Sequence, residues 1–157
     1  MCTINQKITE SGKKAYKVCR LNENKEVVSL YECFVWEKGT NIAKKLKWIE
    51  EIPLEKWTSK IKIIEQMAFH CFQNKKDAIN FAKKILNLPL SRFLEGATLV
   101  LIEVTLHAAP PETKGTKHLN SVRTGINYVG NPILDTHSPV YVAPIAKWDG
   151  TYEVIEM

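Results

Sequence analysis

The segment between residues 67 and 106 constrains the fold most, because a strand pattern, a helix pattern and a second strand pattern follow one another there. Residues 68–72 form a short aromatic run that favours a strand. Residues 75–87 then repeat apolar side chains at the spacing of an amphipathic helix, with lysines on the opposite face. Residues 99–106 are apolar on both faces at their start, so they predict a central strand. The apolar helix positions are Ala78, Phe81, Ala82, Ile85 and Leu86.

The ends of this helix are marked by local residues. Asn74 is a natural N-cap, and Asp77 three residues later completes a capping-box-like pair. Pro89 ends the helix, because proline cannot continue the backbone hydrogen-bond pattern.

Two turn sequences predict β-hairpins. Asn22-Glu23-Asn24-Lys25 separates two β-rich runs near the N-terminus. Asp149-Gly150 separates two β-rich runs near the C-terminus, and Asp-Gly is the strongest short hairpin pattern. The second turn therefore predicts a C-terminal β-hairpin.

Together these patterns predict an α+β fold in a single domain of 157 residues. We expect a mainly antiparallel sheet with one principal helix, at about residues 75–87, packed on one face. Residues 1–14 are expected to form a loose arm or a short edge strand. Residues 108–138 are rich in Asn, Gly and Pro and are expected to be largely irregular.

Composition favours a soluble, cytoplasmic protein with an anionic partner. The net charge is +5 and the pI is near 9.0, which favours nucleic acid, nucleotides or an acidic protein face. No apolar run reaches the roughly 18 residues that a membrane span needs, and the first residues lack the apolar core of a secretory signal. The four cysteines match no metal or redox spacing, so free buried thiols in a reducing compartment are expected. We expect no metal site and no cofactor.

The candidate ligand-binding residues come from one loop and one strand. Arg123, Asn127 and Tyr128 lie in a polar stretch without a regular pattern, and such stretches either carry binding residues or are ordinary connections. His70 is added as a semi-buried histidine of the aromatic strand. His70 and Cys71 are not a catalytic pair, because neighbouring residues of a strand point to opposite faces.

Glu103 is the acid of interest on the predicted central strand. Alternation places it on the face of Leu99 and Leu101, where it lies either on a solvated part of the sheet or in a functional site. Arg20 is its expected partner if the two strands are neighbours.

One segment resembles part of the ADP-ribosyltransferase-like proteins. The residues that carry the resemblance are Ala68-Phe69-His70-Cys71-Phe72, Asp77-Ala78 and Phe81-Ala82. The resemblance covers about a quarter of the chain, and it implies that Arg20 and Glu103 handle a nicotinamide dinucleotide. The family's Ser-Thr-Ser or Tyr-rich middle element is missing, and Leu101 stands where a second Gln or Glu is expected.

A basic cluster with an aromatic residue is the candidate nucleic-acid surface. It consists of Lys44, Lys45, Lys47 and Trp48, with Trp57 nearby. The alternative is a solvated helix face with its aromatic side chain turned inward.

The sequence contains no complete catalytic constellation, phosphate loop or nucleophile elbow. We therefore expect a small non-catalytic binding or regulatory protein that recognises an acidic protein surface or a nucleotide. The alternatives are an ADP-ribosyltransferase-like enzyme that uses Arg20 and Glu103, and a nucleic-acid-binding protein that uses the region from Lys44 to Trp57.

Overall fold

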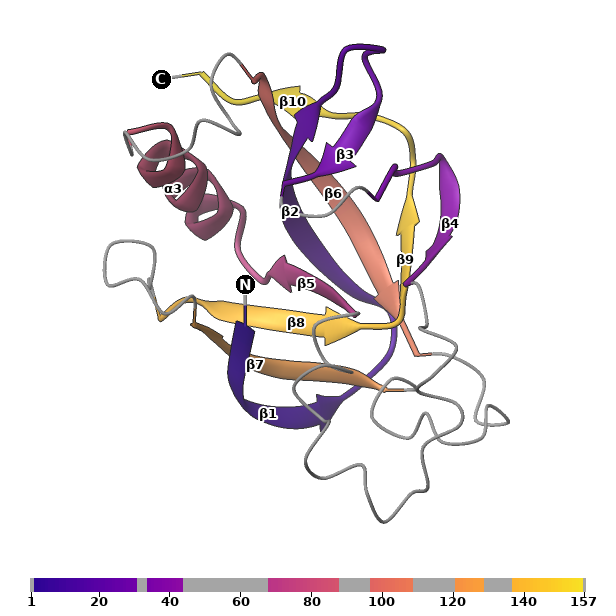
Figure 1. Ribbon diagram of the computed structural model, residues 1–157. Helices are drawn as coiled ribbons and strands as arrows, with labels where there is room; N and C mark the ends of the chain where they lie inside the picture. The colour runs from indigo at the N-terminus through magenta and orange to yellow at the C-terminus, as the bar shows by residue number, and fades with distance from the viewer. Residues whose placement is uncertain are drawn as a thin grey trace, which may run out of the picture.

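The computed structural model describes residues 2–30, 34–43, 68–87, 97–108, 121–128 and 137–156. Within these ranges the chain forms a mainly antiparallel sheet and one helix, α3 (Lys75–Leu86), as the sequence predicted (Figure 1). The strands are β1 (Cys2–Thr9), β2 (Lys13–Leu21), β3 (Val27–Ser29), β4 (Gly39–Ile42), β5 (Phe69–Phe72), β6 (Leu99–His107), β7 (Val122–Tyr128), β8 (Pro139–Ala143), β9 (Ile145–Trp148) and β10 (Glu153–Val154). No helix in these ranges is long and apolar enough to cross a membrane.

The strand order of the sheet is β1-β7-β8-β5-β2-β6-β9-β4, with β3 paired to β2 and β10 paired to β6. β6 is central, as predicted, because β2 lies along one side of it and β9 and β10 lie along the other. Its first four residues are all buried, and Glu103 is its first exposed residue. A strand with neighbours on both edges can bury both faces, which explains the unbroken apolar run.

One face of the sheet shares an apolar cluster with α3. The helix buries Ala78, Phe81, Ala82 and Ile85, the apolar positions that the periodicity predicted, whereas Leu86 is only partly buried. These side chains form one apolar cluster with residues of β2, β5, β6 and β8, and the rings of Phe72 and Phe81 lie 5.2 Å apart.

The predicted capping box at the start of α3 does not form. Asn74 occupies the N-cap position with an extended backbone, but its side chain makes no cap hydrogen bond. Its amide Nδ2 instead donates to Asp77 Oδ2 at 3.1 Å. The two side chains satisfy each other rather than the free backbone N–H groups of the first turn.

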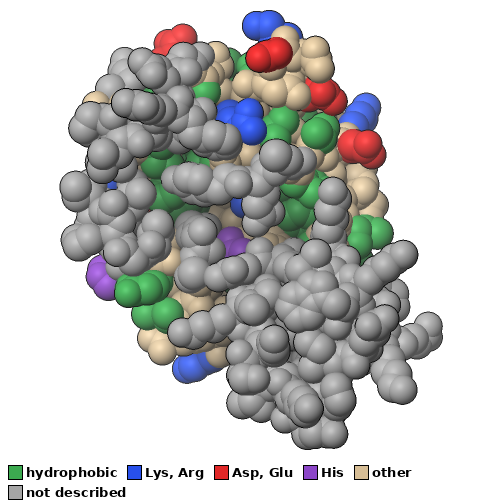
Figure 2. Space-filling view, viewed as in Figure 1, with side chains coloured by type: hydrophobic (Ala, Val, Ile, Leu, Met, Phe, Trp, Pro, Cys, Tyr) green, Lys and Arg blue, Asp and Glu red, His purple; other side chains and the backbone are tan. Residues whose placement is uncertain are grey.

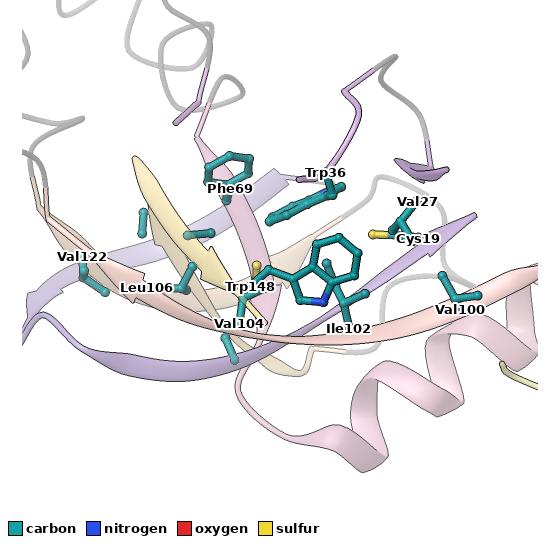
Figure 3. Close-up of a cluster of buried hydrophobic side chains, with 14 residues drawn as sticks. Cys19, Val27, Trp36, Phe69, Val100, Ile102, Val104, Leu106, Val122 and Trp148 are labelled. Carbon is teal, nitrogen blue, oxygen red and sulfur yellow. The ribbon is translucent and has the colours of Figure 1, made fainter. Parts of the chain in front are cut away.

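The opposite face of the sheet carries a second apolar cluster built around Trp36, Phe69 and Trp148 (Figure 3). The rings of Trp36 and Phe69 lie 4.8 Å apart, and Phe34 packs edge-on against both. Two buried free thiols belong to this cluster, and burial raises the pKa of Cys19 to about 12 and that of Cys71 to about 11. The expectation of buried free thiols is confirmed for these two cysteines.

The N-terminal hairpin is confirmed, because β2 and β3 pair around the polar turn at residues 22–25. The strands that flank Asp149-Gly150 differ from the prediction, since β9 and β10 both pair with β6 instead of with each other. Asp149 Oδ1 accepts hydrogen bonds from the backbone N and the hydroxyl of Thr151, and these bonds lower the pKa of Asp149. Trp148 Nε1 also donates to Thr151 O at 2.7 Å. These local bonds let the chain turn briefly and then continue along β6.

Two stretches are more ordered than the sequence indicated. Of the alternatives for the first 14 residues, the edge strand is observed, because β1 pairs with β7. The prediction of irregular structure across residues 108–138 is wrong for β7. The buried positions of β7 include Arg123, Gly125 and Asn127, so its polar and glycine residues conceal the usual strand pattern. The loop predicted near residues 110–117 lies outside the described residues.

Candidate functional site

Strand register brings three of the four predicted ligand-binding residues to one face of the sheet. His70 on β5 and Arg123 on β7 both pair with Val142 on β8, so the three side chains form one cross-strand row. Asn127 is four residues beyond Arg123 and therefore lies on the same face. Tyr128 falls on the opposite face of β7 and is 44% exposed.

β1 adds residues to this face, because a glycine in the neighbouring strand β7 leaves room for β1 to lie close to it. A Cβ atom added to Gly125 would lie 2.2 Å from Thr3 Cγ2 and 3.0 Å from Ile4 O, so only glycine lets β1 approach this closely. The β1–β7 register shifts by one residue between Ile4 and Lys7, and Asn5 at this bulge has a positive φ of 57°.

The contact between Thr3 and His70 shows that this part of the sheet is strongly curved. Two strands, β7 and β8, separate β1 from β5 in the sheet, which would place them about 14 Å apart in a flat arrangement. Thr3 Oγ1 nevertheless lies 2.8 Å from His70 Nδ1, and the two share a buried hydrogen bond. The face that carries these side chains must therefore be concave.

A chain of hydrogen bonds runs along this concave face. Arg123 Nη1 donates to Gln6 Oε1 at 3.0 Å, and Gln6 Nε2 donates to Thr3 O at 3.2 Å. Arg123 Nε also donates to Ser121 Oγ at 3.3 Å, which fixes the plane of the guanidinium group. We call Thr3, Gln6, His70, Arg123 and Asn127 the concave polar cluster.

Most of the concave polar cluster is withdrawn from solvent. Thr3 and Arg123 are each 8% exposed, His70 is 7% exposed and Asn127 is fully buried. Polar interactions are stronger in such surroundings than in water, because fewer solvent dipoles screen them. The cluster contains a guanidinium group, an imidazole and an amide, and such groups are suited to binding a carboxylate or a phosphate.

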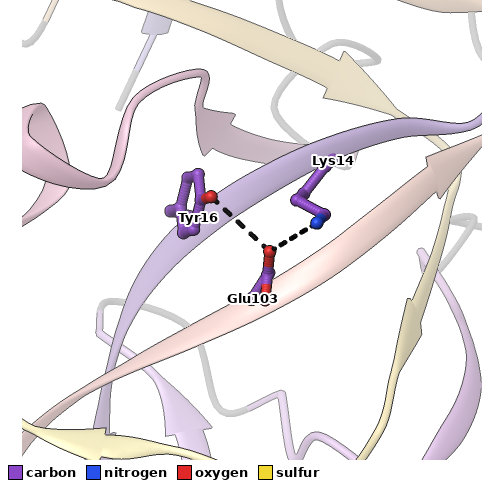
Figure 4. Close-up of polar contacts among 3 residues, drawn as sticks. All are labelled: Lys14, Tyr16 and Glu103. Carbon is purple, nitrogen blue, oxygen red and sulfur yellow. Dashed lines mark hydrogen bonds and ion pairs between the residues drawn. The ribbon is translucent and has the colours of Figure 1, made fainter.

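Arg20 and Glu103 are not brought together. They lie on the same face of neighbouring strands, but Arg20 pairs with Leu99, which precedes Glu103 by four residues. That offset corresponds to roughly 13 Å along the strand. Glu103 instead accepts a hydrogen bond from Tyr16 at 3.5 Å and forms an ion pair of 3.2 Å with Lys14 (Figure 4).

The side chain of Glu103 is 51% exposed, which matches the solvated-face alternative rather than a buried acid. The predicted nucleic-acid residues Lys44, Lys45, Lys47 and Trp48 lie outside the described residues. Within the described part of the chain, no three His, Cys, Asp or Glu side chains gather closely enough to hold a metal ion.

Thr3 and Gln6 could not be predicted as site residues, because they lie in a segment with a polar, basic composition. Gly125 was the one residue that could have indicated the close approach of β1, since a glycine inside a strand often marks a close backbone approach. It could be used only after residues 122–128 were known to form a strand.

Comparison with known proteins assigns no family, because no known protein family, curated protein or solved structure matches this chain.

Proposed function

We propose that this chain is a small non-catalytic binding protein, and that its concave polar cluster recognises an anionic ligand. The row formed by His70, Val142 and Arg123 carries this proposal, because it places an imidazole and a guanidinium group on one curved face. The proposal favours a nucleotide phosphate over an acidic protein surface. Groups that are more than nine-tenths buried are out of reach of a flat protein face, which favours a small ligand.

The orientation of Arg123 supports this choice of ligand. Gln6 and Ser121 fix two of its N–H groups, so the guanidinium plane is set before a ligand arrives. A preorganised donor loses less conformational entropy on binding. His70 is similarly held in place by its buried hydrogen bond with Thr3.

Binding is favoured over the ADP-ribosyltransferase-like alternative by the placement of Glu103. Its ion pair with Lys14 and its offset from Arg20 support a role in the solvated surface. The buried thiols of Cys19 and Cys71 support the proposal of a cytoplasmic, reducing location.

Isothermal titration calorimetry with ATP and with adenosine tests the proposed function. ATP should bind and adenosine should not, because the phosphates supply the charge that Arg123 and His70 recognise. Arg123→Lys keeps the charge but loses the planar fork, and it should weaken ATP binding by at least about tenfold. His70→Gln keeps a hydrogen-bonding side chain and should also weaken binding.

Tyr128→Phe is the matched control, because Tyr128 lies on the opposite face and is exposed. Circular dichroism of each variant separates loss of binding from loss of folding. Equal affinity of wild type, Arg123→Lys and Tyr128→Phe for ATP would contradict the proposal, as would the absence of ATP binding to the wild type.

A further inference from the structure

The outward face of α3 carries a basic stripe along its whole length. Successive residues of an α-helix are about 100° apart, so positions 76, 80, 83, 84 and 87 project within about 100° of one another. All five are exposed, and they are Lys76, Asn80, Lys83, Lys84 and Asn87. We call them the lysine stripe; they lie opposite the buried residues of the helix.

Carboxylates of the described residues do not neutralise the stripe. The described ion pairs involve Lys14 with Glu103 and Lys75 with Glu153, neither of which lies on the stripe. The Lys75–Glu153 contact is 2.9 Å long, and it raises the pKa of Lys75. Asp77, the acid in the first turn, is partly buried and is held by Asn74.

The exposed charges around the β2–β3 turn and β4 are mixed in sign. In Figure 2, acidic and basic side chains are interspersed along the margin near the β2–β3 turn and β4. The exposed residues there include Glu23, Lys25, Glu26, Glu37 and Lys38. The stripe on α3 differs because its charged members all have the same sign.

Helix stability explains only two of the three lysines of the stripe. Lys83 and Lys84 lie in the last turn, where cations interact favourably with the helix dipole. Lys76 lies in the first turn, where a cation is unfavourable and an acid would stabilise the helix. A lysine at position 76 therefore works against the stability of α3, which indicates a role in binding.

We propose that the lysine stripe binds the sugar-phosphate backbone of a nucleic acid. Asn80 and Asn87 lie among the lysines and add hydrogen-bond donors, which are common in backbone contacts. The stripe has no apolar side chain, whereas a protein interface needs an apolar core and a membrane-surface helix needs apolar anchors. Lys76 and Lys83 are about 10 Å apart along the helix axis, so the stripe spans several phosphates. This surface is distinct from the concave polar cluster.

Fluorescence polarisation with a labelled 20-base-pair duplex DNA and a labelled 20-nucleotide single strand tests this proposal at 50–200 mM NaCl. If the three lysines contact phosphates, they contribute about −2.7 to the slope of log K against log salt for the duplex. Replacing all three by glutamine should remove that contribution. Lys76→Glu should weaken binding by about tenfold while its Tm stays at or above that of the wild type.

Lys147→Glu is the matched control, because it changes the net charge equally at an exposed position on β9, a strand that lies away from α3 (Figure 1). It should change the affinity less than twofold. Equal weakening by Lys76→Glu and Lys147→Glu would overturn the proposal in favour of net charge alone. Absence of binding at 50 mM NaCl would also overturn it, as would equal competition by polyglutamate or by vesicles containing phosphatidylserine.

Discussion

Gly125→Ala tests whether β1 approaches its neighbouring strand β7 as closely as the structure indicates. The added Cβ would meet Thr3 Cγ2 at 2.2 Å and the backbone oxygen of Ile4 at 3.0 Å. Overpacking of this kind costs about 1–3 kcal/mol. Gly125 has no positive φ, so alanine can adopt its backbone conformation and returns about 0.4–1 kcal/mol by restricting the unfolded chain. The midpoints of these two ranges leave a net loss of about 1.3 kcal/mol.

Urea denaturation followed by tryptophan fluorescence measures this loss. A paired variant locates its cause, because Thr3→Ser removes Cγ2 and keeps the hydroxyl that bonds to His70. The double variant Gly125→Ala, Thr3→Ser should therefore recover much of the stability, and the recovery is the coupling energy of a double-mutant cycle. The close approach to the oxygen of Ile4 would remain.

The sign of the change in the free energy of unfolding decides whether the close packing is real. If Gly125→Ala is more stable than the wild type by about 0.4–1 kcal/mol, only the unfolded-state term is acting. That result would refute the close packing of β1 on β7, and with it the curvature that joins Thr3 to His70.

Three further perturbations have defined outcomes. Ile102→Ala should lower the free energy of unfolding by about 2–5 kcal/mol in the same urea assay, because Ile102 is fully buried. A loss below about 1 kcal/mol would contradict its core position. The folded chain keeps the thiol protons of Cys19 and Cys71, with pKa values of about 12 and about 11, whereas the unfolded chain loses them near the ordinary thiol pKa of 9.0. The free energy of unfolding should therefore be unaffected by these thiols below pH 9, and above pH 9 it should fall by up to about 1.4 kcal/mol per pH unit for each thiol. If the double variant Cys19→Ala, Cys71→Ala loses as much stability between pH 8 and 10 as the wild type does, this linkage is contradicted. Glu103→Gln should change stability by less than about 1 kcal/mol, because its ion pair is exposed; loss of a nicotinamide-dinucleotide-cleaving activity in this folded variant would support the enzymatic alternative instead.

The elements with a regular hydrophobic period could be predicted from the sequence. α3 was predicted within one residue of its end because its buried positions, from Ala78 to Ile85, repeat at helical spacing. β5 and β6 were predicted because their apolar runs are short and unbroken. β7 could not be predicted, since three of its buried residues are arginine, glycine and asparagine, and their burial depends on β1 and β8.

The candidate site could be predicted only in part, for the same reason. Arg123, Asn127 and His70 were chosen for their chemistry, but their meeting on one face depends on pairing registers that one sequence does not contain. Tyr128 was grouped with them by proximity along the chain, and strand alternation places it on the other face. Thr3 enters the site through curvature, which is a property of several strands together.

Nuclear magnetic resonance titration with ATP tests the central claim most directly, because it locates the ligand on the protein. We predict that the largest chemical-shift changes occur at the imidazole of His70, at the guanidinium of Arg123 and at the side-chain amide of Asn127, with Tyr128 ring signals little affected. Changes confined to the lysine stripe of α3, or no saturable change at any site, would contradict the assignment of the concave polar cluster as an anion-binding site.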